Sequence, residues 1–184
     1  TGTETALDLT ALGLGGEITQ IGDYCFYNTA VERVILPEAL TSIQQYAFAR
    51  SKIKTIAIPG GTEFIGKYAF FNTPIESVIF AEAGNLKVIE QYAFYFTKSL
   101  QSVSLPASLT TMGSYAFYQS GITAVAFAEN SAIEVIPEHA FASTKITSIV
   151  LPDSVIKISD NAFRDCESLS SVTFGKGEGL QVRS

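Results

Sequence analysis

Seven times along this chain a small residue is directly followed by phenylalanine. The phenylalanines of these pairs lie 22, 22, 24, 23, 24 and 22 residues apart. A period of this length, held across nearly the whole chain, is typical of stacked supersecondary units rather than of a domain with one central core. The sequence therefore predicts a solenoid, in which each unit packs mainly on its neighbours. The seven pairs are Cys25-Phe26, Ala47-Phe48, Ala69-Phe70, Ala93-Phe94, Ala116-Phe117, Ala140-Phe141 and Ala162-Phe163.

One repeat, residues 43–64, shows what each unit is expected to contain. Tyr46-Ala47-Phe48 predicts a short helical turn. Ile56 and Ile58 predict a strand with one side in the core, because residues two apart on a strand share a face, and Pro59 stops that strand. Stacking such units about 4.8 Å apart gives a parallel sheet, with the phenylalanine turns on the opposite side. The predicted fold class is an α/β-type repeat solenoid with a parallel strand face and short helical turns.

The whole chain, residues 1–184, is predicted to be a single solenoid. Residues 9–20 supply a half repeat, in which Leu12 superposes on Val34, and residues 21–182 supply seven repeats of 22 to 25 residues. Because neither end carries an obvious capping unit, we expect the chain to be part of a longer protein or to make an oligomer contact. Eight strand pieces should stack in chain order, centred on Leu12, Val34, Ile56, Val78, Val103, Val125, Ile149 and Val172.

Composition and charge exclude several classes of protein. With 47% hydrophobic and 16% charged residues, the chain is too apolar for a disordered segment. Its net charge of −6 disfavours DNA, RNA and anionic lipid surfaces as partners. The longest apolar runs are only as long as a strand, so no segment is expected to insert into a membrane. We therefore expect neither a nucleic acid nor a membrane among the partners.

The residues that most often carry catalysis are scarce. The single histidine, His139, occupies the position that tyrosine holds in five other repeats, and no partner is spaced to activate it. No Cys or His pair has the spacing of metal ligands, and the scattered acids are interpreted as solvated loop charges. Gly13, Gly15 and Gly16 precede no long helix, so they are interpreted as a loop. We expect no enzyme activity, no cofactor and no metal.

Two further columns of the repeat are expected to be structural. Three residues after each phenylalanine stands Ser, Thr or, once, Cys166, where a hydroxyl can satisfy backbone groups at the end of the turn. Cys25 replaces alanine in a core column and is expected to be buried. Six repeats separate the two cysteines, roughly 30 Å at about 4.8 Å per repeat, which is too far for a disulfide. Pairing of Cys166 with another chain stays open.

Two segments carry the most complete copy of the repeat. Residues 89–94 read Ile-x-x-Tyr-Ala-Phe, and residues 100–106 read Leu-x-x-Val-x-Leu-Pro. Degenerate copies over residues 9–182 resemble the BspA-like leucine-rich repeats. The resemblance implies a right-handed leucine-rich-repeat array and a secreted or surface-displayed bacterial protein, because several members of that family are adhesins for host extracellular-matrix proteins or cells. No ligand residue is carried over, since the family has no fixed binding motif.

All eight tyrosines fall in two columns, two residues before and one residue after the phenylalanine. These positions are three apart, so the two rings of one repeat should pair on one face of the turn. The fourth repeat has one extra residue before Leu100, which is expected to push Phe96 or Lys98 toward solvent. The rings either pack between turns or form a recognition stripe. The densest part of that stripe, and the candidate partner-binding site, is Tyr92, Tyr95, Phe96, Tyr115 and Tyr118.

The outward side of the strands is the alternative surface. Its residues, such as Ser102 and Ser104, are small and mostly uncharged, which fits either a tightly packed sheet or a surface that binds by shape. The leading hypothesis is a non-enzymatic cell-surface or secreted protein-binding module, adhesin-like, whose partner is a protein such as a host extracellular-matrix or cell-surface protein. The alternative is a structural spacer that displays another domain and has no ligand of its own.

Overall fold

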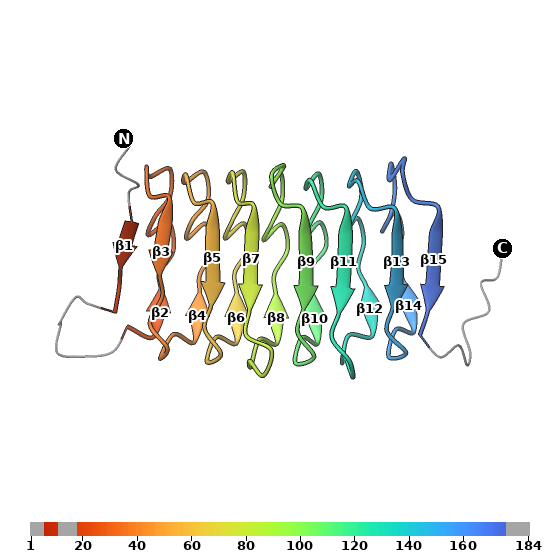
Figure 1. Cartoon of the computed structure of the whole chain (residues 1–184), viewed down its shortest axis with the longest axis horizontal. Helices are drawn as coiled ribbons and strands as arrows, with labels where there is room; N and C mark the ends of the chain where they lie inside the picture. The colour runs from red at the N-terminus through yellow and green to blue at the C-terminus, as the bar shows by residue number, and fades with distance from the viewer. Residues whose placement is uncertain (1–5, 11–17, 176–184) are drawn as a thin grey trace.

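The computed structural model describes residues 6–10 and 18–175, and this part of the chain contains fifteen strands and no helix. The strands form two rows that run along a flat stack (Figure 1). The strand face consists of β1 (Ala6–Asp8), β3 (Arg33–Ile35), β5 (Thr55–Ile58), β7 (Ser77–Phe80), β9 (Ser102–Leu105), β11 (Ala124–Phe127), β13 (Ser148–Leu151) and β15 (Ser171–Phe174). The short row consists of β2 (Gln20–Ile21), β4 (Ser42–Ile43), β6 (Phe64–Ile65), β8 (Val88–Ile89), β10 (Thr111–Met112), β12 (Val135–Ile136) and β14 (Lys157–Ile158).

The strands stack in chain order and pair in parallel, as the repeat predicts (Figure 1). In the register, Ile56 of β5 lies beside Val78 of β7, and Val103 of β9 beside Val125 of β11. On the strand face, hydrogen-bonded pairing is interrupted between β7 and β9 and between β11 and β13. Both interruptions follow a repeat whose loop after the strand is longer than that of its neighbours. The extra residues are therefore accommodated on one edge of the stack.

The prediction of helical turns is wrong. Tyr46 and Arg50 have φ angles of 53° and 59°, in the left-handed region, and the corresponding residues of the other turns do the same. The backbone N–H groups alternate in direction: that of Ala47 donates to the Gln44 carbonyl within the turn (3.3 Å), whereas that of Phe48 donates to the Ala69 carbonyl of the next repeat (2.8 Å). A helix would use every N–H within its own segment. The turns instead form a third hydrogen-bonded side of the stack.

The first strand is centred on Leu7, not on Leu12. Leu7 pairs with Val34, and Leu9, which is buried, takes the place that Leu36 has in the next repeat. The sequence offers two apolar pairs with the same spacing, residues 7 and 9 or residues 12 and 14, and spacing alone does not separate them. Leu12 itself lies outside the described residues.

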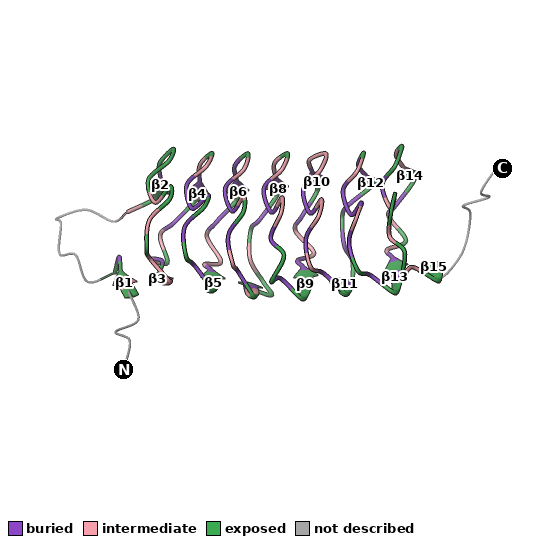
Figure 2. Cartoon of the chain, turned by 90° about the horizontal axis from the view of Figure 1, so that it is seen from above, coloured by how far each residue is buried: buried purple, intermediate pink, exposed green. Residues whose placement is uncertain are grey.

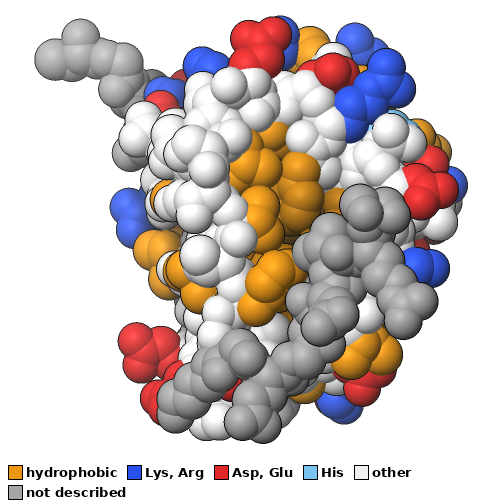
Figure 3. All heavy atoms as spheres, turned by 90° about the vertical axis from the view of Figure 1, so that its right-hand side faces the viewer, with side chains coloured by type: hydrophobic (Ala, Val, Ile, Leu, Met, Phe, Trp, Pro, Cys, Tyr) orange, Lys and Arg blue, Asp and Glu red, His pale blue; other side chains and the backbone are white. Residues whose placement is uncertain are grey.

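The core lies between the strand face and the turns (Figure 2). The phenylalanines of five consecutive turns are fully buried, and neighbouring rings of the whole column stack with centroids 5.0 to 5.9 Å apart. At the C-terminal end of the described stack the core side chains are visible in the middle of the face (Figure 3), and Val172 of β15 is 36% exposed. Burial of each repeat therefore depends on the repeat beside it.

Candidate functional site

A continuous column of stacked rings runs along the turns. Tyr24, Tyr46, Tyr68, Tyr92 and Tyr115 stack one on the next, with centroids 4.7 to 4.8 Å apart. His139 continues the column, because its ring lies 4.4 Å from that of Tyr115 and nearly parallel to it. The backbone sets this spacing: each of these residues has a positive φ, and its ring is carried by a turn that is hydrogen-bonded to the next turn.

The second tyrosine column pairs with the first, as the sequence predicts. The rings of Tyr92 and Tyr95 meet edge to face with centroids 5.8 Å apart, and those of Tyr115 and Tyr118 with centroids 5.5 Å apart. The pairs are those expected, but the reason is different. A left-handed residue at the first position, rather than a helical face, brings rings three residues apart together.

The structure brings all five residues of the candidate site into one group of touching rings, called the aromatic cluster from here on. Tyr92 stacks on Tyr115 (4.8 Å), Tyr95 packs against Tyr118 (5.5 Å), and Phe96 meets Tyr95 edge to face (6.0 Å). All five rings are half-buried. Each ring is therefore partly open to solvent and contacts at least one neighbouring ring.

The bulge expected in the fourth repeat concerns Phe96 and Lys98. Lys98 is exposed, whereas Phe96 stays half-buried. The ammonium of Lys98 turns back over the Phe96 ring, 4.1 Å from its centroid, in a cation–π contact. Lys52, at the same position of a repeat without the extra residue, is exposed as well, so the exposure of Lys98 does not require the bulge.

Three of the stacked phenols, those of Tyr46, Tyr68 and Tyr115, are harder to ionise than free tyrosine. Burial raises the pKa of Tyr46 and of Tyr68, and the neighbouring tyrosines add to the effect because a second phenolate would lie close to the first. The pKa of Tyr115 is raised in the same direction by partial desolvation and then by the carboxylate of Glu138. The phenol hydroxyls of the column can both donate and accept hydrogen bonds.

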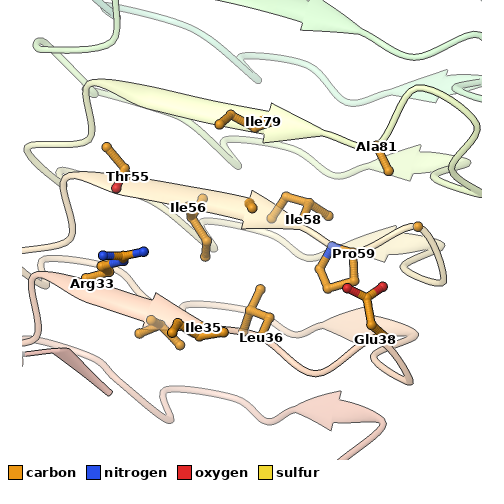
Figure 4. Close-up of a pocket in the computed structure, with 13 residues that line it drawn as sticks. Arg33, Ile35, Leu36, Glu38, Thr55, Ile56, Ile58, Pro59, Ile79 and Ala81 are labelled. Atoms are coloured by element: carbon orange, nitrogen blue, oxygen red, sulfur yellow. The ribbon is translucent and has the colours of Figure 1, made fainter. Parts of the chain in front are cut away.

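Unlike the turn face, the described strand face carries no column of aromatic rings. From β5 onward its outward residues are uncharged and mostly small, but Ile79 and Val150 are 60% and 61% exposed. A hollow of about 610 Å³, lined among others by Ala57, lies between the side chains of Ile35 and Ile79, with Arg33 at one end (Figure 4). A second hollow, of about 570 Å³, is bordered by Val150. Isolated apolar side chains therefore stand on this face beside shallow depressions.

The residues considered for chemistry have structural surroundings. His139 has a side chain that is only 12% exposed, with Nδ1 3.3 Å from a carboxylate oxygen of Glu138. Within residues 6–10 and 18–175, no group of three or more His, Cys, Asp or Glu side chains is placed to hold a metal ion. In the same ranges no helix is long and apolar enough to cross a membrane. The arrangement offers rings, hydroxyls and a few cations for binding.

One expectation about the cysteines is wrong. Cys25 is exposed, not buried, because a described turn covers it on only one side, whereas the equivalent Ala47 has a turn on both. Cys166 is half-buried, and its thiol lies 3.1 Å from the Phe141 carbonyl oxygen and 3.3 Å from Thr144 Oγ1. Both thiols are free. The sulfur of Cys166 thus takes part in the hydroxyl column that the sequence predicts.

Only some hydroxyls of that column have a hydrogen-bond partner. Thr73 and Thr97 donate from Oγ1 to the carbonyl oxygen of the phenylalanine three residues earlier, at 3.0 and 2.8 Å. The Oγ atoms of Ser51 and Ser120 are buried without a hydrogen-bond partner. Where serine replaces threonine, the backbone N–H of the serine reaches the phenylalanine carbonyl instead, at 3.1 Å in both turns.

Sequence reasoning also missed a polar hollow of about 350 Å³ beside the aromatic cluster. Its lining includes Arg50, Lys52, Phe96 and Lys98, and two asparagines from neighbouring turns. The signal was present in the repeat, because Lys52 and Lys98 both stand four residues after a column phenylalanine. It was missed because the net charge of the whole chain hides a local cluster of cations.

The architecture, a parallel-strand β-solenoid with a repeat of 22 to 24 residues, defines the class: a leucine-rich-repeat solenoid. The model of the BspA type leucine rich repeat region matches residues 19–135 and 134–181 in six copies. The chain belongs to this family.

Solved structures show the same fold. A leucine-rich repeat protein from Bacteroides ovatus superposes with a TM-score of 0.65 and 20% identity over 93% of this chain and 55% of that protein. The pneumococcal vaccine antigen PcpA gives a TM-score of 0.61 and 18% identity over 86% of this chain and 60% of PcpA. The chain thus spans between about half and two thirds of their lengths, and identity at this level shows the fold alone. No curated protein matches the chain.

Proposed function

We propose that this chain is a non-enzymatic protein-binding module of a secreted or surface-displayed bacterial protein, and that the aromatic cluster is its contact surface. The observation that supports the proposal is the group of five touching rings, all half-buried, at Tyr92, Tyr95, Phe96, Tyr115 and Tyr118. Tyrosine supplies contact area together with a polar hydroxyl, and such residues often dominate the energy of an interface.

The way the rings are held favours binding. Each ring of the cluster is fixed by stacking or edge contacts with its neighbours, so little side-chain freedom remains to be lost when a partner docks. Their hydroxyls can donate and accept hydrogen bonds with a polar rim on the partner. A pre-ordered surface of this kind suits recognition of a protein better than turnover of a substrate.

The partner class follows from the family. BspA-like proteins include adhesins for host matrix proteins and cells, and we propose a host extracellular-matrix or cell-surface protein as the ligand. Localisation at the cell surface is part of the same proposal and also depends on the family resemblance. The alternative function is a spacer that displays another domain, which is favoured by the largely uncharged strand face from β5 onward.

The test is a binding screen of the chain against immobilised matrix and cell-surface proteins. With the ligand found, Tyr95→Ser combined with Tyr118→Ser should weaken binding by at least about 2 kcal/mol, roughly thirtyfold, without loss of the fold. The matched control is Ile35→Ser combined with Ile79→Ser, which removes two exposed apolar residues from the strand face and should leave the affinity unchanged. No binding to any protein of the panel would favour the spacer.

A further inference from the structure

The polar hollow next to Phe96 is built from four consecutive turns. Asn28, Arg50, Asn72 and Phe96 are the residues with left-handed φ at the end of each turn, and all four line it. Because the turns are hydrogen-bonded to one another through these residues, the walls are fixed by the backbone: the N–H of Asn28 donates to Ala49 and that of Arg50 to Phe71. The volume of about 350 Å³ leaves room for a group larger than a single water molecule.

The charge of this hollow is opposite to that of the protein. Its lining contains three cations, Arg50, Lys52 and Lys98, and no acid, although the chain as a whole carries −6. In the part of the chain that the structure describes, none of the three forms a salt bridge. Arg50 has only a long contact of 3.4 Å to the Tyr27 hydroxyl, and Lys98 is held over the Phe96 ring. Positive charge is thus concentrated here without a compensating carboxylate.

A buried hydroxyl without a partner also belongs to the lining, a feature that this turn shares with the serine turn at Ser120 outside the hollow. Ser51 lines the hollow and is 1% exposed, yet its Oγ has no hydrogen-bond partner. The threonine at the same position of the next turn, Thr73, is satisfied by the Phe70 carbonyl. A buried polar atom without a partner is costly, so a group that accepts its hydrogen bond would be favoured at this position.

We propose that this hollow binds a tetrahedral oxyanion, a sulfate or phosphate group carried by the partner. Three cations supply the charge, the side-chain amides of Asn28 and Asn72 supply neutral donors, and the hydroxyl of Ser51 supplies a further one. The net negative charge of the chain disfavours a long polyanion, but the site would bind only one anionic group. The inference extends the proposed function, since Phe96 belongs to both the hollow and the aromatic cluster, but it is tested with the free anion and does not need a protein ligand.

The experiment measures the melting temperature of the chain against inorganic sulfate, inorganic phosphate and acetate, each balanced with sodium chloride to constant ionic strength. A ligand that binds only the folded state raises the melting temperature in a saturable way. Sulfate and phosphate also stabilise proteins in general by exclusion from the surface, and that effect does not saturate. The proposal predicts a saturable rise for sulfate or phosphate and a weaker one for acetate. Whichever of the two tetrahedral anions binds more tightly indicates whether the partner carries a sulfate or a phosphate group.

Variants separate the site from a general salt effect. Arg50→Gln combined with Lys98→Gln should weaken the apparent anion affinity at least about tenfold. The matched control, Lys145→Gln combined with Lys157→Gln, removes the same charge elsewhere and should leave the affinity unchanged. Ser51→Ala should reduce anion affinity while the chain without anion stays at least as stable, because an unsatisfied hydroxyl is removed.

A nuclear magnetic resonance titration reports the position directly. The side-chain amide signals of Asn28 and Asn72 should shift and saturate with sulfate or phosphate, and the shifts should disappear in the Arg50→Gln, Lys98→Gln variant. Equal affinity in this variant and the parent, or no saturable response beyond that to chloride, would overturn the proposal. A positive anion result with a negative protein screen would keep the anion site and reject only the protein-binding function.

Discussion

The turn face and the strand face of this solenoid differ in how their large apolar side chains are packed. On the turn face, large rings stack at 4.7 to 4.8 Å, and from Tyr46 to Tyr115 each ring is half-buried. On the strand face, the large residues Ile79 and Val150 stand 60% and 61% exposed among small ones. The difference arises because the turn column is filled with rings in consecutive repeats, whereas the outward strand column is not. A filled column orders its own side chains, and an interrupted column leaves them isolated.

The largest expected effect is the loss of stability when a core ring is removed, compared with the loss when an exposed strand residue is removed. Phe94 is fully buried between Phe70 and Phe117, so Phe94→Ala should lower the free energy of unfolding by about 3 to 5 kcal/mol. Ile79→Ala should cost less than about 1 kcal/mol, because the residue is 60% exposed. Urea denaturation measures both. Equal losses for the two variants would show that the phenylalanine column is not the core.

Phe94 also shows what could be predicted from sequence. The period fixes that these phenylalanines share one column and that the strands stack in order, because only one arrangement keeps seven equivalent positions in register. The left-handed backbone at Tyr46 was not predictable from the same pattern, since tyrosine has no preference for that conformation. Asparagine at residues 28 and 72, two residues after the phenylalanine, was the available clue to such a backbone.

At the candidate site, the ring pairs could be predicted and their exposure could not. The most exposed rings are Tyr24 and Tyr27, at 50% and 38%, outside the aromatic cluster. Ring density in the sequence identifies where rings touch, but the exposure of a ring depends on which turns cover it. The hollow at Arg50 likewise depends on residues from four turns, so no single repeat contains it.

A second effect should appear where two turns approach closely. A Cβ added at Gly66 would lie 2.7 Å from the Gln44 carbonyl carbon, which is backbone and cannot turn aside. Gly66→Ala should therefore cost about 1 to 3 kcal/mol of stability. Gly22, in the same position of an earlier repeat, has nothing within 4 Å of an added Cβ, and Gly22→Ala is the matched control. If both variants melt together with the parent, the turns are not held as tightly as described.

A smaller, stabilising effect is expected in the hydroxyl column. Ser51→Thr should place a hydroxyl where Thr73 and Thr97 donate to a phenylalanine carbonyl. The gain should be about 1 kcal/mol, the size of one hydrogen bond by a buried group. Thermal unfolding of this variant beside Thr73→Ser checks the expectation, because the reverse change should destabilise. A loss of stability on Ser51→Thr would mean that a threonine in this turn cannot donate to the phenylalanine carbonyl as Thr73 does.

The smallest effect should come from alkaline pH. The folded chain keeps the phenolic protons of Tyr46, Tyr68 and Tyr115 to higher pH than the unfolded chain, because their pKa values are raised. The unfolded state therefore loses protons first, and stability should fall as pH rises above about 10. Changing all three tyrosines to phenylalanine should flatten this fall. An unchanged pH profile in that variant would show that ionisation of these three hydroxyls does not cause the loss of stability.

The most direct test of which face carries the function is hydroxyl-radical footprinting of the chain with and without the partner found in the screen. We expect Tyr95 and Tyr118 to become protected from oxidation in the complex, while Ile79 and Val150 on the strand face keep their reactivity. Protection of Ile79 and Val150 with unchanged oxidation of the two tyrosines would contradict the account and move the binding surface to the strand face.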